Sequence, residues 1–288
     1  METPLSSNVT VYRPCGRLGT GFGAACGTTV RSVLAHRELI AQLVRRDLLS
    51  EFKGSFVGPL WLALAPVAAS LSWLFLHRAR LLAPGDTGIP YPAFVLTGTT
   101  FWGVFTGVFS SGSMALTGSW HLLQHVRFPH EVLFISRAVV RYVNFLLSFL
   151  CSLLLMALLG VRVSPLALVA PILVLPLVLY GVALGMMVAV PAVLSYDFRR
   201  IVSRGIGLVL FVTPVAYTPD ALARTPFRSL ITFNPLAHQI VGLRDIVLTG
   251  SLTEPLGFWL SAAASVVVFL GAWRLFYLTE ERVMERIP

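Results

Sequence analysis

The side chains that could do chemistry in this 288-residue sequence are few and scattered. Three histidines, His121, His125 and His130, fall in one predicted loop beside Glu131, but no cysteine pair or further carboxylate completes a metal-ligand set. The polar face of a loop is the favoured interpretation of this cluster. The sole lysine, Lys53, follows no GxxxxGK(S/T) pattern, and the HExxH and GxSxG patterns are absent, so no ATP-binding loop or hydrolase site is predicted.

Acidic side chains are also missing from the long apolar segments. These segments contain no Asp, Glu or Lys, whereas ion-coupled transporters usually keep an ionisable relay at membrane depth. Asp220, Asp245 and Glu254 lie outside them and are too dispersed for the site of a membrane-embedded transferase. The three cysteines have no CxxC spacing. We expect a chain without enzyme activity, cofactor or metal of its own, and any transport by it needs energy from elsewhere.

The composition indicates that lipid covers most of the outer surface. Hydrophobic residues make up 56% of the chain and charged residues only 12%, against about 25% charged in soluble domains. The basic balance, 22 Lys and Arg against 13 Asp and Glu, could suggest nucleic acid as a partner. Cytoplasmic loops facing anionic headgroups are the favoured explanation in a membrane protein, so we expect membrane lipids and no nucleic acid as partners.

The hydrophobic segments predict an all-α integral membrane protein. A helix needs about 20 mostly apolar residues to cross a bilayer, and arginines mark the cytoplasmic side. They cluster before the first segment and after the second, fourth and sixth, so both termini are expected in the cytoplasm. The six predicted spans, which together form a domain over residues 54–280, are roughly 57–77, 92–116, 134–160, 164–190, 201–218 and 256–278.

The segment before the first predicted span has the pattern of an amphipathic helix. Over residues 33–53, Ile40, Val44 and Leu48 repeat every four residues, and charged side chains occupy the other side. A helix lying flat in the cytoplasmic headgroup region fits this pattern. Residues 1–32 are expected to be a flexible cytoplasmic tail, because they have no apolar region behind a basic start, as a signal peptide would. Residues 281–288 are expected to be a second cytoplasmic tail.

The stretch between the last two predicted spans is apolar but divided into short pieces. Asn234-Pro235 is a favourable N-cap and first-turn pair, and Thr249-Gly250 should end the helix that starts there. Two short re-entrant helices within residues 219–255 would explain the composition, with their non-helical backbone facing protein or a water-filled cavity. We therefore expect the outer gate of any conduit in this region.

The second predicted span combines small, hydroxyl and aromatic residues. Gly103 and Gly107 form a GxxxG motif, and Gly181 and Gly185 form another in the fourth span. Such motifs support close helix packing, but they also suit a subunit interface or a smooth conduit, and the sequence leaves these alternatives open. The residues expected to line the conduit and its outer gate are Thr100, Phe101, Trp102, Phe105, Phe211, Tyr217, Phe233, Asn234 and Pro235.

Four segments in the right order resemble the ABC-2 type exporter permeases, most closely those that export O-antigen, capsule and teichoic-acid polysaccharides. The stretch RRDLLSEFKGSFVGPLWLALAP at residues 45–66 is similar to the family's segment leading into the first span. The others are LLQHVRFPHEVLFISRAV at 122–139, LSYDFRRIV at 194–202 and NPLAHQIVGLRDIVLTG at 234–250. The resemblance covers roughly residues 33–280, and Phe52-Lys53 stands where the family commonly has Tyr-Lys or Tyr-Arg.

The resemblance implies a division of labour between chains. Two copies of the permease would work with two copies of a separate ATPase, which binds ATP and magnesium, in the cytoplasmic membrane of a bacterium. A lipid-linked glycan would enter near Arg45, Arg46, Asp47, Lys53 and Trp61, and Arg46 and Asp47 would fasten the amphipathic helix to the turn at residues 196–199. The residues that would couple the permease to the ATPase are His121, Gln124, Arg127, Phe128, Pro129, Glu131, Asp197 and Arg199.

Two alternatives stay open at the level of sequence. One is an ABC-2 permease for small molecules or drugs, and the other is a membrane-embedded transferase. The pattern of Arg46 and Asp47 followed by Gly58 and Trp61 favours the glycan exporters over the first, and the scattered carboxylates disfavour the second. The motifs do not specify the sugar.

Overall fold

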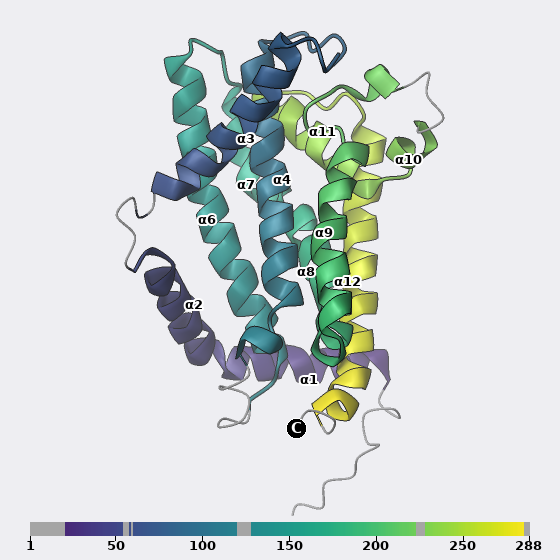
Figure 1. The fold of residues 1–288 in the computed structure, drawn as a ribbon. Helices are drawn as coiled ribbons and strands as arrows, with labels where there is room; N and C mark the ends of the chain where they lie inside the picture. Colours follow the sequence, from purple (N-terminus) through teal and green to yellow (C-terminus); the bar gives the residue numbers. More distant parts are fainter. Residues whose placement is uncertain (1–20, 54–57, 59, 120–127, 223–227, 285–288) are drawn as a thin grey trace, which may run out of the picture.

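The computed structural model describes residues 21–53, 58, 60–119, 128–222 and 228–284, and most of these are helical. Figure 1 shows an upright bundle with α1 lying across one end, which we call the α1 end, and α10 and α11 at the opposite, α11 end. The elements are α1 (Phe22–Ala35), α2 (Arg37–Phe52), α3 (Leu60–Arg78), α4 (Tyr91–Ser113), η1 (Thr117–Ser119), α6 (Glu131–Leu158), η2 (Pro165–Val169), α7 (Ala170–Leu173), α8 (Leu175–Leu194), α9 (Tyr196–Val212), η3 (Pro219–Leu222), α10 (Arg228–Thr232), α11 (Pro235–Leu248) and α12 (Pro255–Met284).

Five helical segments of the described residues are long and apolar enough to cross a membrane. They correspond to the first, second, third, fourth and sixth predicted spans, and they make the chain a multi-pass membrane protein. Their bounds are Leu60–Arg78, Tyr91–Ser113, Glu131–Leu158, Pro165–Leu194 and Pro255–Thr279.

The fifth predicted span is shorter than its composition suggested. Helix α9 ends at Val212 because Thr213 precedes Pro214 and takes the extended conformation that a following proline imposes, with φ −106° and ψ 125°. Its 17 residues rise about 26 Å, and Arg199, Arg200 and Arg204 occupy its first half. Five of the six expected spans are therefore confirmed as helices long and apolar enough to cross, and a crossing by α9 stays a prediction.

The core of the bundle forms where α8 packs between α4 and α12. Gly181 and Gly185 of α8 meet α4 closely, since a Cβ placed on Gly185 would lie 3.1 Å from Cα of Gly112. A Cβ on Gly181 would likewise lie 3.1 Å from Cγ1 of Val108. The GxxxG motif of α8 therefore serves close packing of helices within one chain.

The N-terminal region forms two helices rather than one. Residues 22–32, expected to belong to a flexible tail, lie in α1, although glycines and threonines make this segment a poor helix former on its own. Packing compensates, because Ala25 of α1 is buried in the main hydrophobic core. Helix α1 crosses the end of the bundle, and α2 then runs beside the lower part of α6 rather than flat beneath the bundle (Figure 1).

Candidate functional site

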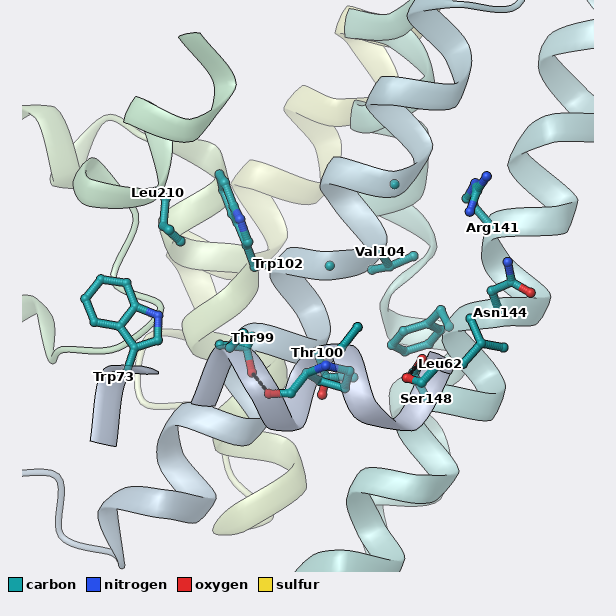
Figure 2. Close-up of a pocket in the computed structure, with 16 residues that line it drawn as sticks. Leu62, Trp73, Thr99, Thr100, Trp102, Val104, Arg141, Asn144, Ser148 and Leu210 are labelled. Atoms are coloured by element: carbon teal, nitrogen blue, oxygen red, sulfur yellow. Dashed lines mark hydrogen bonds between the residues drawn. The ribbon is translucent and has the colours of Figure 1, made fainter. Parts of the chain in front are cut away.

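A groove of about 440 Å³ runs along one side of the bundle, between α3, α4 and α6 (Figure 2). Leu210 of α9 closes one of its margins. Thr100 and Trp102, two of the residues expected to line a conduit, line this groove. The other lining residues are Leu62, Ala65, Pro66, Ala69, Trp73, Thr99, Gly103, Val104, Gly107, Arg141, Asn144, Phe145 and Ser148.

Small residues of α4 keep the groove open. A Cβ added at Gly103 would have no neighbouring atom within 4 Å, and one added at Gly107 would meet only Cδ of Arg141, at 3.4 Å. The GxxxG motif of α4 thus meets no backbone of another helix within 4 Å in the described chain, in contrast to the motif of α8. These glycines create space along the groove, and the conduit and subunit-interface interpretations of this motif stay predictions.

Phe101 and Phe105 do not line the groove, although we expected them to. Both are 0% exposed and point into the core, where Phe101 packs against Phe145 and Phe149. Residues four positions apart share one face of a helix, and Trp102 and Gly103 fall on the next face. Phe101 and Phe105 therefore belong to the core, and Trp102 and Gly103 belong to the groove.

The wall that α6 provides also holds α3 in place. Pro66 has no N–H, so the carbonyl of Leu62 loses its usual helical donor. Ser148 of α6 replaces this donor, with its Oγ 2.6 Å from the Leu62 oxygen. Thr99 of α4 donates to the Pro66 carbonyl at 3.4 Å and to its own helix at 2.9 Å. The hydroxyl groups of the groove are thus occupied by backbone, which leaves a surface that is largely apolar and aromatic.

Glu51 of α2 binds two residues that line the groove, Arg141 and Asn144 of α6. One carboxylate oxygen pairs with Nη1 of Arg141 at 2.7 Å, and the other accepts from Nδ2 of Asn144 at 2.7 Å. Sequence reasoning missed Glu51. The signal was present, because Asp47 and Glu51 are four residues apart on α2, as Arg137 and Arg141 are on α6, which is the spacing of complementary helix faces.

The residues expected to admit the substrate lie in α2, directly after it and at the start of α3. Arg45 and Lys53 are exposed, and Trp61 at the start of α3 is 59% exposed. Arg46 pairs with the adjacent Asp47 at 2.7 Å. In the described chain α2 packs against α6 and pairs with it through Glu51, and the attachment of Arg46 and Asp47 to residues 196–199 stays a prediction.

Aromatic side chains flank the groove towards the α11 end. Trp73 of α3 lines it and meets Phe211 of α9 edge to face, with ring centroids 6.4 Å apart. Phe211 is otherwise largely exposed, as is Phe233, at 85%. Phe233 is not among the residues that line the groove, whereas Phe211 contacts the lining residue Trp73.

The segment after α9 is held by a buried arginine that sequence reasoning counted only as a loop charge. Arg244 of α11 is 3% exposed and donates to the carbonyls of Pro214 and Val215, at 3.1 and 3.4 Å. Its guanidinium lies 3.6 Å from the ring centroid of Phe94. Burial lowers the pKa of Arg244 to about 10, against the opposing effect of Asp245, so the side chain stays charged at neutral pH.

Tyr217, Asn234 and Pro235 support the same segment. Tyr217 donates to the Phe211 carbonyl at 2.8 Å, and Asn234 Nδ2 donates to Thr213 Oγ1 at 3.1 Å. Asn234 also caps α11, accepting from Leu236 N at 3.0 Å, and Pro235 is the first helical residue. This confirms the predicted start of the helix, which ends as predicted before Thr249 and Gly250.

The residues expected to couple to an ATPase lie at the α1 end where the structure describes them. His121, Gln124 and Arg127 lie outside the described residues. Phe128 and Glu131 are buried at the start of α6, with Pro129 between them half-buried. Asp197, exposed, and Arg199, half-buried, stand in the first turn of α9, whose start lies at the same end of the bundle (Figure 1).

The groove offers a path for a ligand and little chemistry. Its ionisable lining residue is Arg141, already paired with Glu51. Among the residues that the structure describes, no group of three His, Cys, Asp or Glu side chains could hold a metal ion. Trp73 and Trp102 provide flat faces on which sugar rings could stack, and the apolar remainder makes few directional bonds. Such a surface suits a ligand that slides.

Comparison with characterised proteins agrees with this interpretation. An O-antigen export system permease protein, RfbA, of Myxococcus xanthus is 30% identical over 260 residues, which cover 90% of this chain and 98% of the relative. A protein of the same name from Klebsiella pneumoniae is 24% identical over 219 residues, covering 75% of this chain and 82% of the relative. A second Klebsiella pneumoniae relative is 24% identical over 218 residues. No protein-family model matches the sequence.

The relatives are named as O-antigen export system permeases, and the Myxococcus xanthus relative is similar over 90% of this chain, so neither a drug exporter nor a transferase is favoured. The bundle, the apolar groove and the order of the four sequence segments agree with that name. This chain belongs to the ABC-2 type polysaccharide export permeases and is a transmembrane subunit of an ABC exporter.

Proposed function

We propose that the chain exports a lipid-linked polysaccharide of the O-antigen type across the cytoplasmic membrane of a bacterium, driven by a separate ATPase. The names of the relatives support the substrate class, and the single structural observation that carries the proposal is the open groove. Its walls combine glycines, tryptophans and hydroxyls already bonded to backbone, which is the surface a sugar polymer needs in order to move without being trapped.

The groove is half of a conduit that two copies of the chain complete. It opens on the side of α3, whose exposed face carries Leu64, Leu71 and Phe75. Gly205 and Gly207 of α9 also have no neighbour within 4 Å of a Cβ placed on them. These open faces of α3 and α9, together with the α4 glycines, support a homodimer in which the polymer passes between the two protomers.

Helix α9 is the sixth span in this proposal. Residues 213–217 follow it as a buried turn, so the segment that continues α9 within the protein extends beyond Val212. Helices α10 and α11 re-enter the membrane from the outer side and return, and both chain termini are cytoplasmic. The arginines at the α1 end support this orientation.

Two copies of an ATPase dock at the α1 end. Residues 117–133, among them His121, Gln124 and Arg127, form the coupling element, with Phe128, Pro129 and Glu131 at its junction with α6. The first turn of α9, with Asp197 and Arg199, contributes to the same surface. ATP-driven closure of the partner would push these elements and shift α3, α4 and α9 around the groove. The start of α6 and the start of α9 both lie at the α1 end, which supports this arrangement (Figure 1).

Export in cells tests the proposal. A strain lacking this gene is expected to accumulate finished glycan inside the cell and to lose it from the surface, and the wild-type gene should restore it. Gly103→Phe places a ring in the groove from a position where a Cβ meets no atom within 4 Å, and it should leave the protein in the membrane but reduce surface glycan strongly. The matched control is Gly271→Phe on the exposed face of α12, also with open space around it. Normal surface glycan in the deletion strain would refute the proposal.

A further inference from the structure

A second, polar cavity of about 350 Å³ adjoins the groove at Arg141 and lies between α2, α6 and the end of α4. The two hollows share Arg141, whose guanidinium stands at their boundary. Three guanidinium groups and two carboxylates line the second cavity, leaving one positive charge in excess. Its lining residues are Arg46, Asp47, Ser50, Glu51, Ser111, Gly118, Arg137, Val140 and Arg141.

The excess charge can be assigned to Arg137. Arg46 is paired with Asp47 at 2.7 Å and Arg141 with Glu51 at 2.7 Å. Arg137 instead donates to neutral oxygens, from Nη1 to the Ser111 carbonyl at 3.4 Å and from Nη2 to Ser119 Oγ at 3.1 Å. In the described chain this guanidinium therefore has no carboxylate within ion-pair distance.

The surroundings hold Arg137 ready for an anion. Nη2 lies 3.0 Å from the position of a Cβ placed on Gly118, so the absence of a side chain there makes room for the guanidinium. A guanidinium has five N–H donors, and the two bonds to Ser111 and Ser119 leave the other three available. A guanidinium group that is held in place and has no carboxylate partner is suited to phosphate, because two of its N–H groups can bind two phosphate oxygens.

We propose that this cavity binds the phosphate group of a lipid, with Arg137 as the main contact and Arg141 as the second. The inference deepens the proposed function, on which it rests, because it places the phosphate end of a lipid-linked glycan where the groove begins. The first sugars would then lie beside Gly107 and Trp102. A phospholipid of the surrounding bilayer presents the same phosphate chemistry and is the other source that the test distinguishes.

Binding to the purified full-length chain in a phosphate-free maltoside detergent tests this inference. The probes are farnesyl diphosphate, farnesol, which has the same tail without phosphate, and phosphatidylglycerol. Farnesyl diphosphate is expected to bind more tightly than farnesol, and Arg137→Gln should weaken it about tenfold, the usual loss for a charged hydrogen bond. Arg78→Gln, at the other end of α3, serves as the charge-matched control and should bind as the wild type does.

A second variant avoids the structural contacts of Arg137. Ser50 lies on the exposed face of α2 and lines the cavity, so Ser50→Glu adds a competing carboxylate without disturbing the core. It should also weaken farnesyl diphosphate about tenfold, whereas Ser50→Gln should have little effect. Phosphatidylglycerol binding that depends equally on Arg137 would identify a bilayer phospholipid as an occupant of the same phosphate site.

Equal affinity for farnesyl diphosphate and farnesol would overturn the inference, as would wild-type binding by both Arg137→Gln and Ser50→Glu. The assay needs neither ATPase nor export, so its failure would leave the export proposal intact. Conversely, a deletion strain with normal surface glycan would refute export and leave a measured phosphate site unaffected.

Discussion

Removal of the Glu51 carboxylate should release α2 from the bundle. Glu51 is the residue that ties α2 to α6 through both Arg141 and Asn144, each at 2.7 Å. A hydrogen bond to a charged group contributes about 1.5 to 3 kcal/mol. Because the Arg141 and Glu51 side chains are 37% and 27% exposed, solvent screens the pair. We therefore expect Glu51→Gln to lower the local opening free energy of α2 by about 1 to 2 kcal/mol.

Amide hydrogen exchange measures this opening directly. A loss of about 1 to 2 kcal/mol corresponds to exchange that is about 5- to 30-fold faster, and the increase should be confined to residues 37–52. Glu38→Gln, an exposed carboxylate in the first turn of the same helix, is the control and should leave exchange in the rest of α2 unchanged. Combining Glu51→Gln with Arg141→Gln should give less than the sum of the single effects. Unchanged exchange in Glu51→Gln, or an equal increase in Glu38→Gln, would contradict the role of Glu51 in holding α2 against α6.

Three further variants test the packing that positions the groove. Arg244→Met leaves the Pro214 carbonyl without its donor and should destabilise the protein by about 2 to 4 kcal/mol, seen as a lower melting temperature in detergent, whereas Arg78→Met should melt as the wild type does. Gly185→Leu forces α8 away from α4 and should abolish a folded, monodisperse preparation, while Gly103→Leu should fold normally; equal behaviour of the two would contradict the different roles of the two motifs. Asn234→Ala removes the cap of α11 and should destabilise by about 1 kcal/mol, and no change in melting would show that the cap is dispensable.

Much of the fold could be predicted from local sequence because the physics that sets it is local. Runs of apolar residues indicated the positions of five spanning helices, and the pair Asn234-Pro235 indicated the start of α11. The end of α9 was not predicted, although Pro214 indicates it. Hydropathy alone does not include the conformation that a proline imposes on the residue before it.

The side of each helix that faces the groove was harder to predict. Helix α4 has no charged residue that would mark one of its sides, so no periodic pattern separates buried Phe101 from groove-lining Trp102. The two GxxxG motifs look alike in sequence, and only the partner helix decides that Gly185 is packed and Gly103 is open. The structural roles of Arg244 and Glu51 were also not predicted, because the contacts of a charged residue depend on partners that are distant in sequence.

The central claim is that the groove carries the polysaccharide, and photo-crosslinking during export tests it most directly. A photoreactive amino acid would replace Gly103 in cells that are exporting glycan, with Gly271 as the control position, since both have open space around them. The account predicts that glycan is captured at position 103, that none is captured at position 271, and that capture stops when the ATPase is inactivated. Equal capture at the two positions, or none at position 103 in cells with normal export, would contradict it.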